Sequence, residues 1–216
     1  QTKNGFTLTG KVIGQDTGFI RLNYIDENGI SLHDTTRLEN GTFSFSGFIK
    51  EPTEASLIAN TKYIHVAYNY PDLAEFYLEP GIIRIVLTEN NFKQAKITGS
   101  LTQKEWETLK KEEDNALSQR DRFNMEYNFS LNHPKSYLSP SLIFSDLYDL
   151  SLDSLKMFYN QWYPSIQNSF NGKLIRNEIN KMEWTQIGKT AQDFTTKDIN
   201  DNDVTLSSFK GKSCVL

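Results

Sequence analysis

The sequence predicts an α+β protein that begins with an antiparallel β-sandwich or barrel, continues as a helical segment and ends in the first strands of a further, incomplete domain. Three observations predict this fold class. Apolar and polar residues alternate through the first part of the chain, with the period of half-buried strands. From Ser100 onward apolar residues recur at helical spacing, and short strand-like runs return after Trp184. We therefore expect a β-rich domain over 1–99, a helical region over 100–184 and the start of a third domain over 185–216.

Composition excludes several classes of protein. Of the 216 residues, 38% are hydrophobic and 12% aromatic, which is enough to form a packed core. The formal net charge of -4 offers no basic field for phosphate backbones, so we expect no nucleic-acid partner. No apolar run approaches the roughly 20 residues that span a bilayer, so the chain is not expected to cross a membrane. It opens at Gln1 without an initiator methionine, which indicates a processed or an engineered chain and is compatible with removal of an export signal.

The β-rich part contains closely spaced strand candidates separated by turn residues. Asn28-Gly29 and Asn40-Gly41 are dipeptides favoured in tight hairpins, because both residues tolerate positive φ. Pro80-Gly81 marks a turn between two further strands. Many short strands with such turns are typical of an antiparallel sandwich or barrel. The expected strands are 6–13, 19–24, 30–38, 42–49, 55–59, 64–68, 75–78, 82–87 and 95–98.

The helical region opens with two overlapping capping boxes, one starting at Ser100 and one at Thr102. Apolar residues at helical spacing then predict one long amphipathic helix over 101–128. Pro134 ends it. The next helix is expected to begin with Ser139 as N-cap and Pro140 at the first helical position.

Two more helices are expected before the pattern changes. Ser151 or Asp153 caps the first of them, and Pro164 marks its end. The second covers 166–182 and carries Asn171-Gly172 in its middle, which is unfavourable for a helix interior.

The last part has the features of a linker followed by short strands. Residues 187–191 form the linker, 194–199 and 203–206 the strands, and 200–202 the turn between them. Cys214 to Leu216 has the character of a buried strand that has just begun. A chain that stops inside such a run is expected to be a piece of a longer protein.

These last residues carry a family resemblance. Residues 188–199, Gly-Lys-Thr-Ala-Gln-Asp-Phe-Thr-Thr-Lys-Asp-Ile, followed by 204–212, Val-Thr-Leu-Ser-Ser-Phe-Lys-Gly-Lys, resemble the opening of the peroxiredoxin and TlpA-like thioredoxin families. Gln192 stands in place of the usual proline, and Asn202 stands where a glycine is common. The resemblance implies that 185–216 starts a thioredoxin-like domain, whose Cys-x-x-Cys motif would follow beyond Leu216 at a helix N-terminus that lowers the first thiol's pKa.

The preceding residues also resemble a known arrangement. A β-rich domain followed by a helical stretch containing 133–139 and 167–173 is similar to the accessory region of envelope thiol-disulfide oxidoreductases of Gram-negative bacteria, many of them lipoproteins. The resemblance implies a periplasmic or envelope protein, anchored through a lipoprotein signal that is removed or missing. The chain would then be the non-catalytic N-terminal region, serving client recognition, positioning or self-association. The partners it implies are envelope clients, a redox partner or a second copy in a homodimer.

Two alternatives remain open at this stage. The chain could be a stand-alone envelope binding module with no redox role. The parent enzyme could instead be a peroxiredoxin-type peroxidase, with a single cysteine in a Pro-x-x-x-Thr-x-x-Cys setting. The codons that follow Leu216 discriminate among the three readings.

The sequence assigns no catalytic, cofactor-binding or metal-ligating residue within the chain. Cys214, the single cysteine, falls inside the last strand and is expected to be a small buried apolar residue. The three histidines, His33, His65 and His133, are far apart and lack metal-ligand spacing, so neither a metal nor another cofactor is expected.

An aromatic cluster in the β-rich part is the remaining candidate for a surface site. It comprises Tyr63, Tyr68, Tyr70, Phe76 and Tyr77. The rings could be exposed for a partner or a sugar, but aromatic residues are enriched on the buried faces of sheets, and we favour the core.

Overall fold

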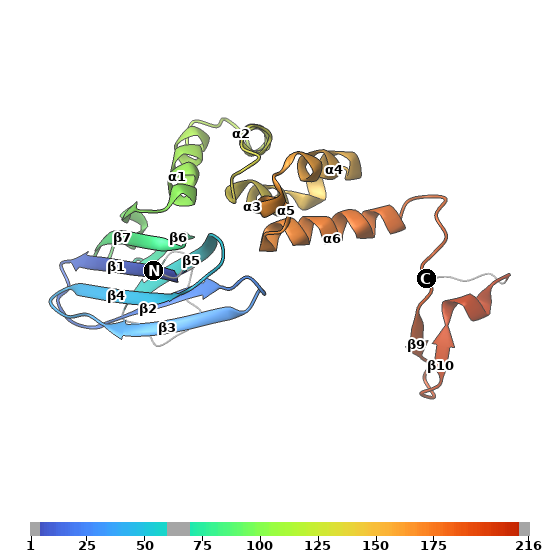
Figure 1. The fold of residues 1–216 in the computed structure, drawn as a ribbon, viewed down its shortest axis with the longest axis horizontal. Helices are drawn as coiled ribbons and strands as arrows, with labels where there is room; N and C mark the ends of the chain where they lie inside the picture. Colours follow the sequence, from blue (N-terminus) through green and yellow to red (C-terminus); the bar gives the residue numbers. More distant parts are fainter. Residues whose placement is uncertain (1–4, 60–69, 212–216) are drawn as a thin grey trace.

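The structure is a computed structural model that describes residues 5–59 and 70–211. Figure 1 shows three parts in chain order: two layers of strands, a group of helices on one side of them, and a small hairpin that stands apart at the C-terminal end. The predicted strand 64–68, together with Tyr63, His65, Tyr68 and Cys214, lies outside the described residues.

The described strands form two four-stranded sheets and one two-stranded sheet. The first sheet has the order β4-β1-β7-β8, the second β3-β2-β5-β6, and the small one pairs β10 with β9. The strands are β1 Gly5–Ile13, β2 Phe19–Ile25, β3 Ser31–Arg37, β4 Thr42–Phe48, β5 Thr53–Ala59, β6 Leu73–Leu78, β7 Gly81–Thr88, β8 Lys96–Thr98, β9 Thr195–Lys197 and β10 Asp203–Thr205.

One apolar core lies between the two large sheets. Alternate residues of both sheets point into it, including Leu8 of β1, Leu22 of β2 and Ile85 of β7, all essentially inaccessible to water. Phe43 and Phe45 of β4 are buried in the same core, as their alternation predicts. This confirms the α+β class with an N-terminal pair of packed sheets.

The purely antiparallel arrangement expected from the sequence is wrong at one pair of strands. β1 and β7 run parallel, with Phe6 opposite Gly81 and Val12 opposite Leu87. The turn at Pro80-Gly81 does not form a hairpin, because β6 belongs to one sheet and β7 to the other. The chain crosses from the second sheet to the first between β6 and β7, and this brings β7 beside β1 in the same direction. The alternation of residues within a strand does not specify which strand becomes its partner.

The helical region contains more and shorter helices than the sequence predicts. They are α1 Leu101–Glu113, α2 Gln119–Asn132, α3 Leu138–Ser145, α4 Leu152–Gln161, α5 Pro164–Gln167 and α6 Phe170–Trp184. Short 3₁₀ turns lie before this region at Phe92–Gln94, within it at Leu147–Asp149 and after it at Leu206–Phe209. Their core is a second apolar cluster centred on Leu155, Phe158 and Ile175.

The single long helix expected over 101–128 is wrong, because it is two helices with a break at 114–118. The Ser118 hydroxyl accepts from the Asp121 backbone N–H at 3.1 Å and donates to the Asp121 carboxylate at 2.9 Å. These two bonds cap a new helix. The apolar spacing continues across the break, which is why periodicity alone predicts one helix.

Two other expected helix starts are also wrong. Ser139 is not an N-cap: α3 begins one residue earlier, and the Ser139 hydroxyl donates instead to the His133 carbonyl at 2.9 Å. Pro140 is tolerated in the first turn of α3, because the first N–H groups of a helix lack intrahelical partners anyway.

The helix expected over 166–182 is divided at Ser169. The Ser169 hydroxyl accepts from the Gly172 N–H at 3.1 Å and caps α6, so that Gly172 lies in the first turn rather than in the middle of a helix. A Cβ atom on Gly172 would lie 2.1 Å from the Ile166 carbonyl oxygen. Of the two caps considered for α4, the structure selects Ser151, which accepts from the Ser154 N–H.

No helix of the described residues is both long and apolar enough to cross a bilayer.

Candidate functional site

A candidate site lies where the second sheet meets the helices. Two adjoining hollows of about 390 Å³ and 310 Å³ open there, and both are lined by Ile25, Glu54 and Tyr77. We call them together the junction groove. Its other walls come from β2, β5, β6 and the helical residues Trp106, Ser141, Phe144 and Phe170.

Tyr77 joins the sheet to the helices in the centre of the junction groove. Its backbone N–H, on the edge strand β6, donates to the Gln103 side-chain oxygen at 2.8 Å. Its hydroxyl donates to Glu54 at 3.3 Å, and the Ser141 hydroxyl donates to the same Glu54 oxygen at 2.7 Å. Trp106 packs edge-on against the Tyr77 ring, with the centroids 6.2 Å apart. Sheet edge and helices are therefore held together by satisfied polar groups.

The Tyr77 phenol keeps its proton. Burial of the ring raises the pKa of this hydroxyl well above its usual value, and the nearby Glu54 carboxylate raises it further. Tyr77 is therefore a hydrogen-bond donor and not a general base at neutral pH.

Carboxylates line the whole length of the junction groove. Glu54 and Glu75 face the first hollow, and Asp26, Glu27 and Glu51 face the second. Among the described residues, no Lys or Arg lines either hollow.

Two of these carboxylates have cationic neighbours outside the hollows, and their pKa values reflect different surroundings. The Lys50 ammonium, 2.7 Å from Glu27, lowers the pKa of that carboxyl. Burial raises the pKa of Glu51, although the Phe170 N–H donates to it at 2.6 Å and Lys173 acts in the opposite direction to burial. Glu51 thereby ties the turn before β5 to the N-terminus of α6.

Within the ranges 5–59 and 70–211, no group of three or more His, Cys, Asp or Glu side chains could hold a metal ion. His33 and His133 are both exposed, and they lie on β3 and at the end of α2. The described part of the groove offers carboxylates, a phenol, hydroxyls and aromatic faces.

The predicted aromatic cluster divides between the core and the junction groove. Phe76 is buried between the sheets, which confirms the core reading for that residue. Tyr70 is half-buried and donates to the Ala59 carbonyl at 3.1 Å. Tyr77 is also buried, but against the helices.

Sequence reasoning missed Glu54, Glu75, Trp106 and Ser141, which come from four different elements. The capping box at Ser100 was the only signal near them. In the structure the Gln103 backbone N–H still donates to the Ser100 hydroxyl, but the Gln103 side chain accepts from Tyr77 at the sheet edge.

A separate group of acids lies between α1, α2 and the end of α3. Burial raises the pKa of Glu126 to about 8, and the neighbouring Asp146 and Glu113 raise it in the same direction. Glu113 is itself buried and bonds through one oxygen to Lys110 at 2.6 Å. The group therefore holds a proton at neutral pH that an exposed carboxyl would release.

This proton makes the stability of the helical region depend on pH. The folded pKa of Glu126 exceeds its ordinary value of 4.5, so the folded state binds the proton more tightly than the unfolded chain does. The free energy of unfolding should fall by about 1–2 kcal/mol from pH 5 to pH 8, a range discounted for the half-exposed side chain. Urea titrations should show that Glu126→Gln removes most of this slope. Glu112→Gln, on the exposed face of α1, should leave the slope unchanged, and an equal change in both variants would contradict the assignment.

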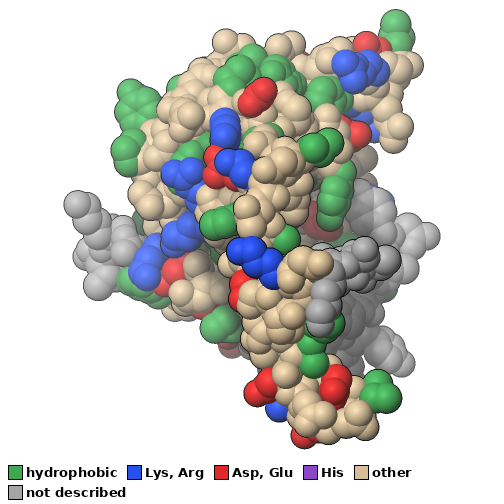
Figure 2. All heavy atoms as spheres, turned by 90° about the vertical axis from the view of Figure 1, so that its right-hand side faces the viewer, with side chains coloured by type: hydrophobic (Ala, Val, Ile, Leu, Met, Phe, Trp, Pro, Cys, Tyr) green, Lys and Arg blue, Asp and Glu red, His purple; other side chains and the backbone are tan. Residues whose placement is uncertain are grey.

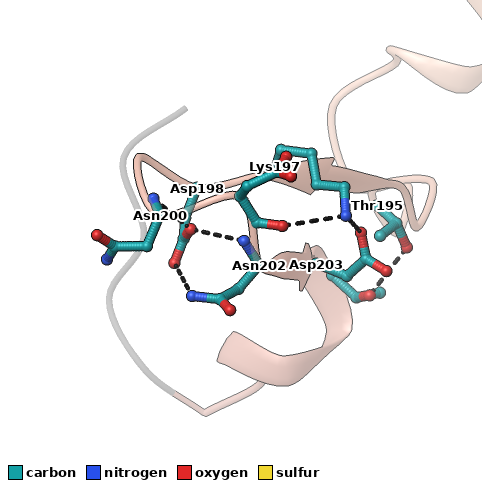
Figure 3. Close-up of polar contacts among 8 residues, drawn as sticks. Thr195, Lys197, Asp198, Asn200, Asn202 and Asp203 are labelled. Atoms are coloured by element: carbon teal, nitrogen blue, oxygen red, sulfur yellow. Dashed lines mark hydrogen bonds and ion pairs between the residues drawn. The ribbon is translucent and has the colours of Figure 1, made fainter.

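The C-terminal hairpin is held by a carboxylate in its turn (Figure 3). Asp198 Oδ1 accepts from the Asn200 and Asn202 backbone N–H groups at 2.8 and 2.9 Å, and Oδ2 accepts from the Asn202 side chain. The Lys197 ammonium lies 2.8 Å from Asp203 across the pair of strands. The Asn202 N–H lowers the pKa of Asp198, so the carboxylate is ionised at neutral pH. All its contacts are within the turn.

Replacing the turn carboxylate should loosen the hairpin alone. A two-stranded hairpin is marginal in water, so the loss of two backbone bonds in its turn is felt directly. We expect Asp198→Ala to make the backbone amides of residues 195–205 exchange roughly fivefold faster. Ile199→Ala, at a fully exposed side chain in the same turn, is the matched control. Hydrogen exchange followed by NMR measures both, and unchanged protection in Asp198→Ala would refute the role of the carboxylate.

The hairpin leaves large apolar side chains in water. Phe194, Ile199 and Phe209 are 48%, 100% and 38% exposed. Figure 2, turned so that the hairpin side of Figure 1 faces the viewer, shows apolar and acidic side chains together on its projecting lower end.

Comparison with known proteins adds one match. Residues 6–106 match the family model described as "Domain of unknown function (DUF4369)". This range covers both large sheets and the first turns of α1, and it ends on Trp106, the residue packed against Tyr77. No curated protein matches the chain.

Proposed function

We propose that the chain is the non-catalytic N-terminal region of a thioredoxin-like thiol-disulfide oxidoreductase of the bacterial envelope, and that its folded part recognises client proteins. The observation that carries the proposal is the residue pattern over 188–212. Its described part forms a β-hairpin followed by a 3₁₀ turn at Leu206–Phe209. The catalytic Cys-x-x-Cys pair would follow Leu216.

The exposed apolar residues of the hairpin support this proposal. A hairpin with Phe194, Ile199 and Phe209 in water buries too little surface to be a domain of its own. A thioredoxin-like core continuing from residue 212 would supply the surface that covers them.

The folded part supports a recognition role. Its described residues offer a groove with aromatic and acidic walls rather than a nucleophile paired with a base. In the proposed enzyme a thiolate of the later pair attacks a client disulfide and forms a mixed disulfide. The second cysteine then displaces the client, which leaves as a dithiol while the pair becomes a disulfide. Under this proposal the protein lies in the periplasm, anchored through an N-terminal lipoprotein signal.

The test begins with the gene. Trp-Cys-x-x-Cys within the twenty or so codons after Leu216 is the expected result. A stop codon, or a continuation without cysteine, would overturn the redox assignment. A lone Pro-x-x-x-Thr-x-x-Cys would replace it with peroxide reduction. The full-length protein should then reduce insulin disulfides, and the 216-residue chain should not.

A further inference from the structure

We infer that the junction groove binds an extended polypeptide segment that presents a lysine or arginine beside apolar side chains. Describing this segment as part of a client rests on the proposed function. The binding itself follows from the charges and shape of the groove, and it needs no cysteine.

Two carboxylates of the first hollow carry the argument for a cation. In the register of β5 and β6, Glu54 lies opposite Tyr77 and Glu75 lies opposite Ser56, so the two carboxylates are diagonal neighbours on the outer face. The Cα atoms of such diagonal neighbours are about 7–8 Å apart. No Lys or Arg among the described residues forms an ion pair with either of them. A cation between them would relieve their mutual repulsion.

The form of the hollow favours a side-chain cation over a metal ion. No three ligating side chains converge in the described residues, whereas the half-buried Trp106 indole lies on the wall beside the carboxylates. An ammonium or guanidinium group at the end of a long apolar stem matches both features, because the stem packs on the ring while the charge meets the acids.

The second hollow supplies the apolar part of the site. Glu54 lines both hollows, and Ile25, Phe144 and Leu174 also line the second. Phe144 and Ile25 are 40% and 37% exposed, so both side chains are accessible to a bound apolar group. A chain lying across Glu54 would place a basic side chain in the first hollow and an apolar one in the second.

The test measures binding of a labelled peptide to the 216-residue chain. The probe is a blocked, fluorescein-labelled peptide of alternating lysine and leucine, and the comparison peptide has glutamate in place of lysine. Fluorescence anisotropy should show that the lysine peptide binds and that raised salt weakens it. Equal binding of the glutamate peptide would overturn the inference.

Matched variants locate the site. Glu54→Gln combined with Glu75→Gln should weaken the lysine peptide about tenfold, because each amide keeps the side chain's shape but loses its charge. Glu39→Gln combined with Glu112→Gln removes the same charge from exposed positions outside the groove and should have little effect. If both pairs of variants weakened binding equally, the peptide would be attracted only by the net charge of the chain. That result would refute the groove as the binding site.

A second pair of variants tests the apolar hollow of the groove. Phe144→Ala should weaken the peptide severalfold, whereas Met157→Ala, at a side chain of equal exposure on α4, should not. Circular dichroism of every variant must match the parent chain. The peptide carries no cysteine and its binding involves no thiol exchange, so failure of this assay would refute the peptide site alone, and a failed gene test would refute the redox assignment alone.

Discussion

Gly99→Ala is expected to lower the free energy of unfolding by at least about 3 kcal/mol. Gly99 links β8 to the Ser100 cap of α1 and adopts a φ of +98°, which side-chain-bearing residues rarely adopt. A Cβ atom would also lie 2.1 Å from the Ile82 carbonyl oxygen on β7. The backbone of the sheet would have to move, because a carbonyl in a paired strand has no flexible end.

Gly81→Ala separates the two causes. Gly81 has a φ of +126°, but nothing lies within 4 Å of the Cβ position. This substitution should therefore carry only the backbone penalty, about 1–2 kcal/mol. Urea denaturation of both variants measures the difference. Equal losses would show that the contact with Ile82 relaxes freely.

Phe158→Ala is expected to cost about 3–5 kcal/mol, because it removes the central ring of the helical core. Phe158 is fully buried on α4, and the Tyr127 ring meets it edge-on with the centroids 4.7 Å apart. The Trp162 indole, at the C-cap of the same helix, has its ring centroid 6.3 Å from that of Phe158. The cavity left behind would be bounded by three helices that cannot close on it without losing other contacts.

Met157→Ala is the neighbouring control. Met157 is 41% exposed, so its truncation should change stability by less than about 0.5 kcal/mol. Unfolding followed by tryptophan fluorescence measures both variants. A loss below about 1 kcal/mol in Phe158→Ala would mean that the helices are not stabilised by this cluster.

Much of the local structure was predictable because local rules decide it. The alternation around Phe43 and Phe45 identifies β4 and its buried face, and Asn40-Gly41 adopts positive φ at both positions, as its residues allow. The start of α1 at Ser100 follows from its side chain alone.

What sequence reasoning missed depends on contacts between distant segments. The parallel partner of β1 follows it only after five other described strands, and nothing within β1 specifies this partner. The apolar spacing of α1 continues across the break before Ser118, so the helical periodicity of the sequence does not indicate that the helix ends there. The junction groove combines Glu54, Tyr77 and Ser141, which become neighbours only after the sheets and helices have packed.

The parallel pairing of β1 also determines when the sandwich can be completed. β1 leaves the ribosome before β7, one of its two neighbours, which begins only at Gly81. The chain between β1 and β7 must lose its conformational freedom before the contacts between these strands can form. This step should therefore be slow, whereas the helices, whose contacts are closer in sequence, should form early. Stopped-flow refolding should show far-ultraviolet helix signal gained before protection of the β1 amides. Until β7 arrives, a chaperone would find the unpaired side of β1 available as an open strand edge.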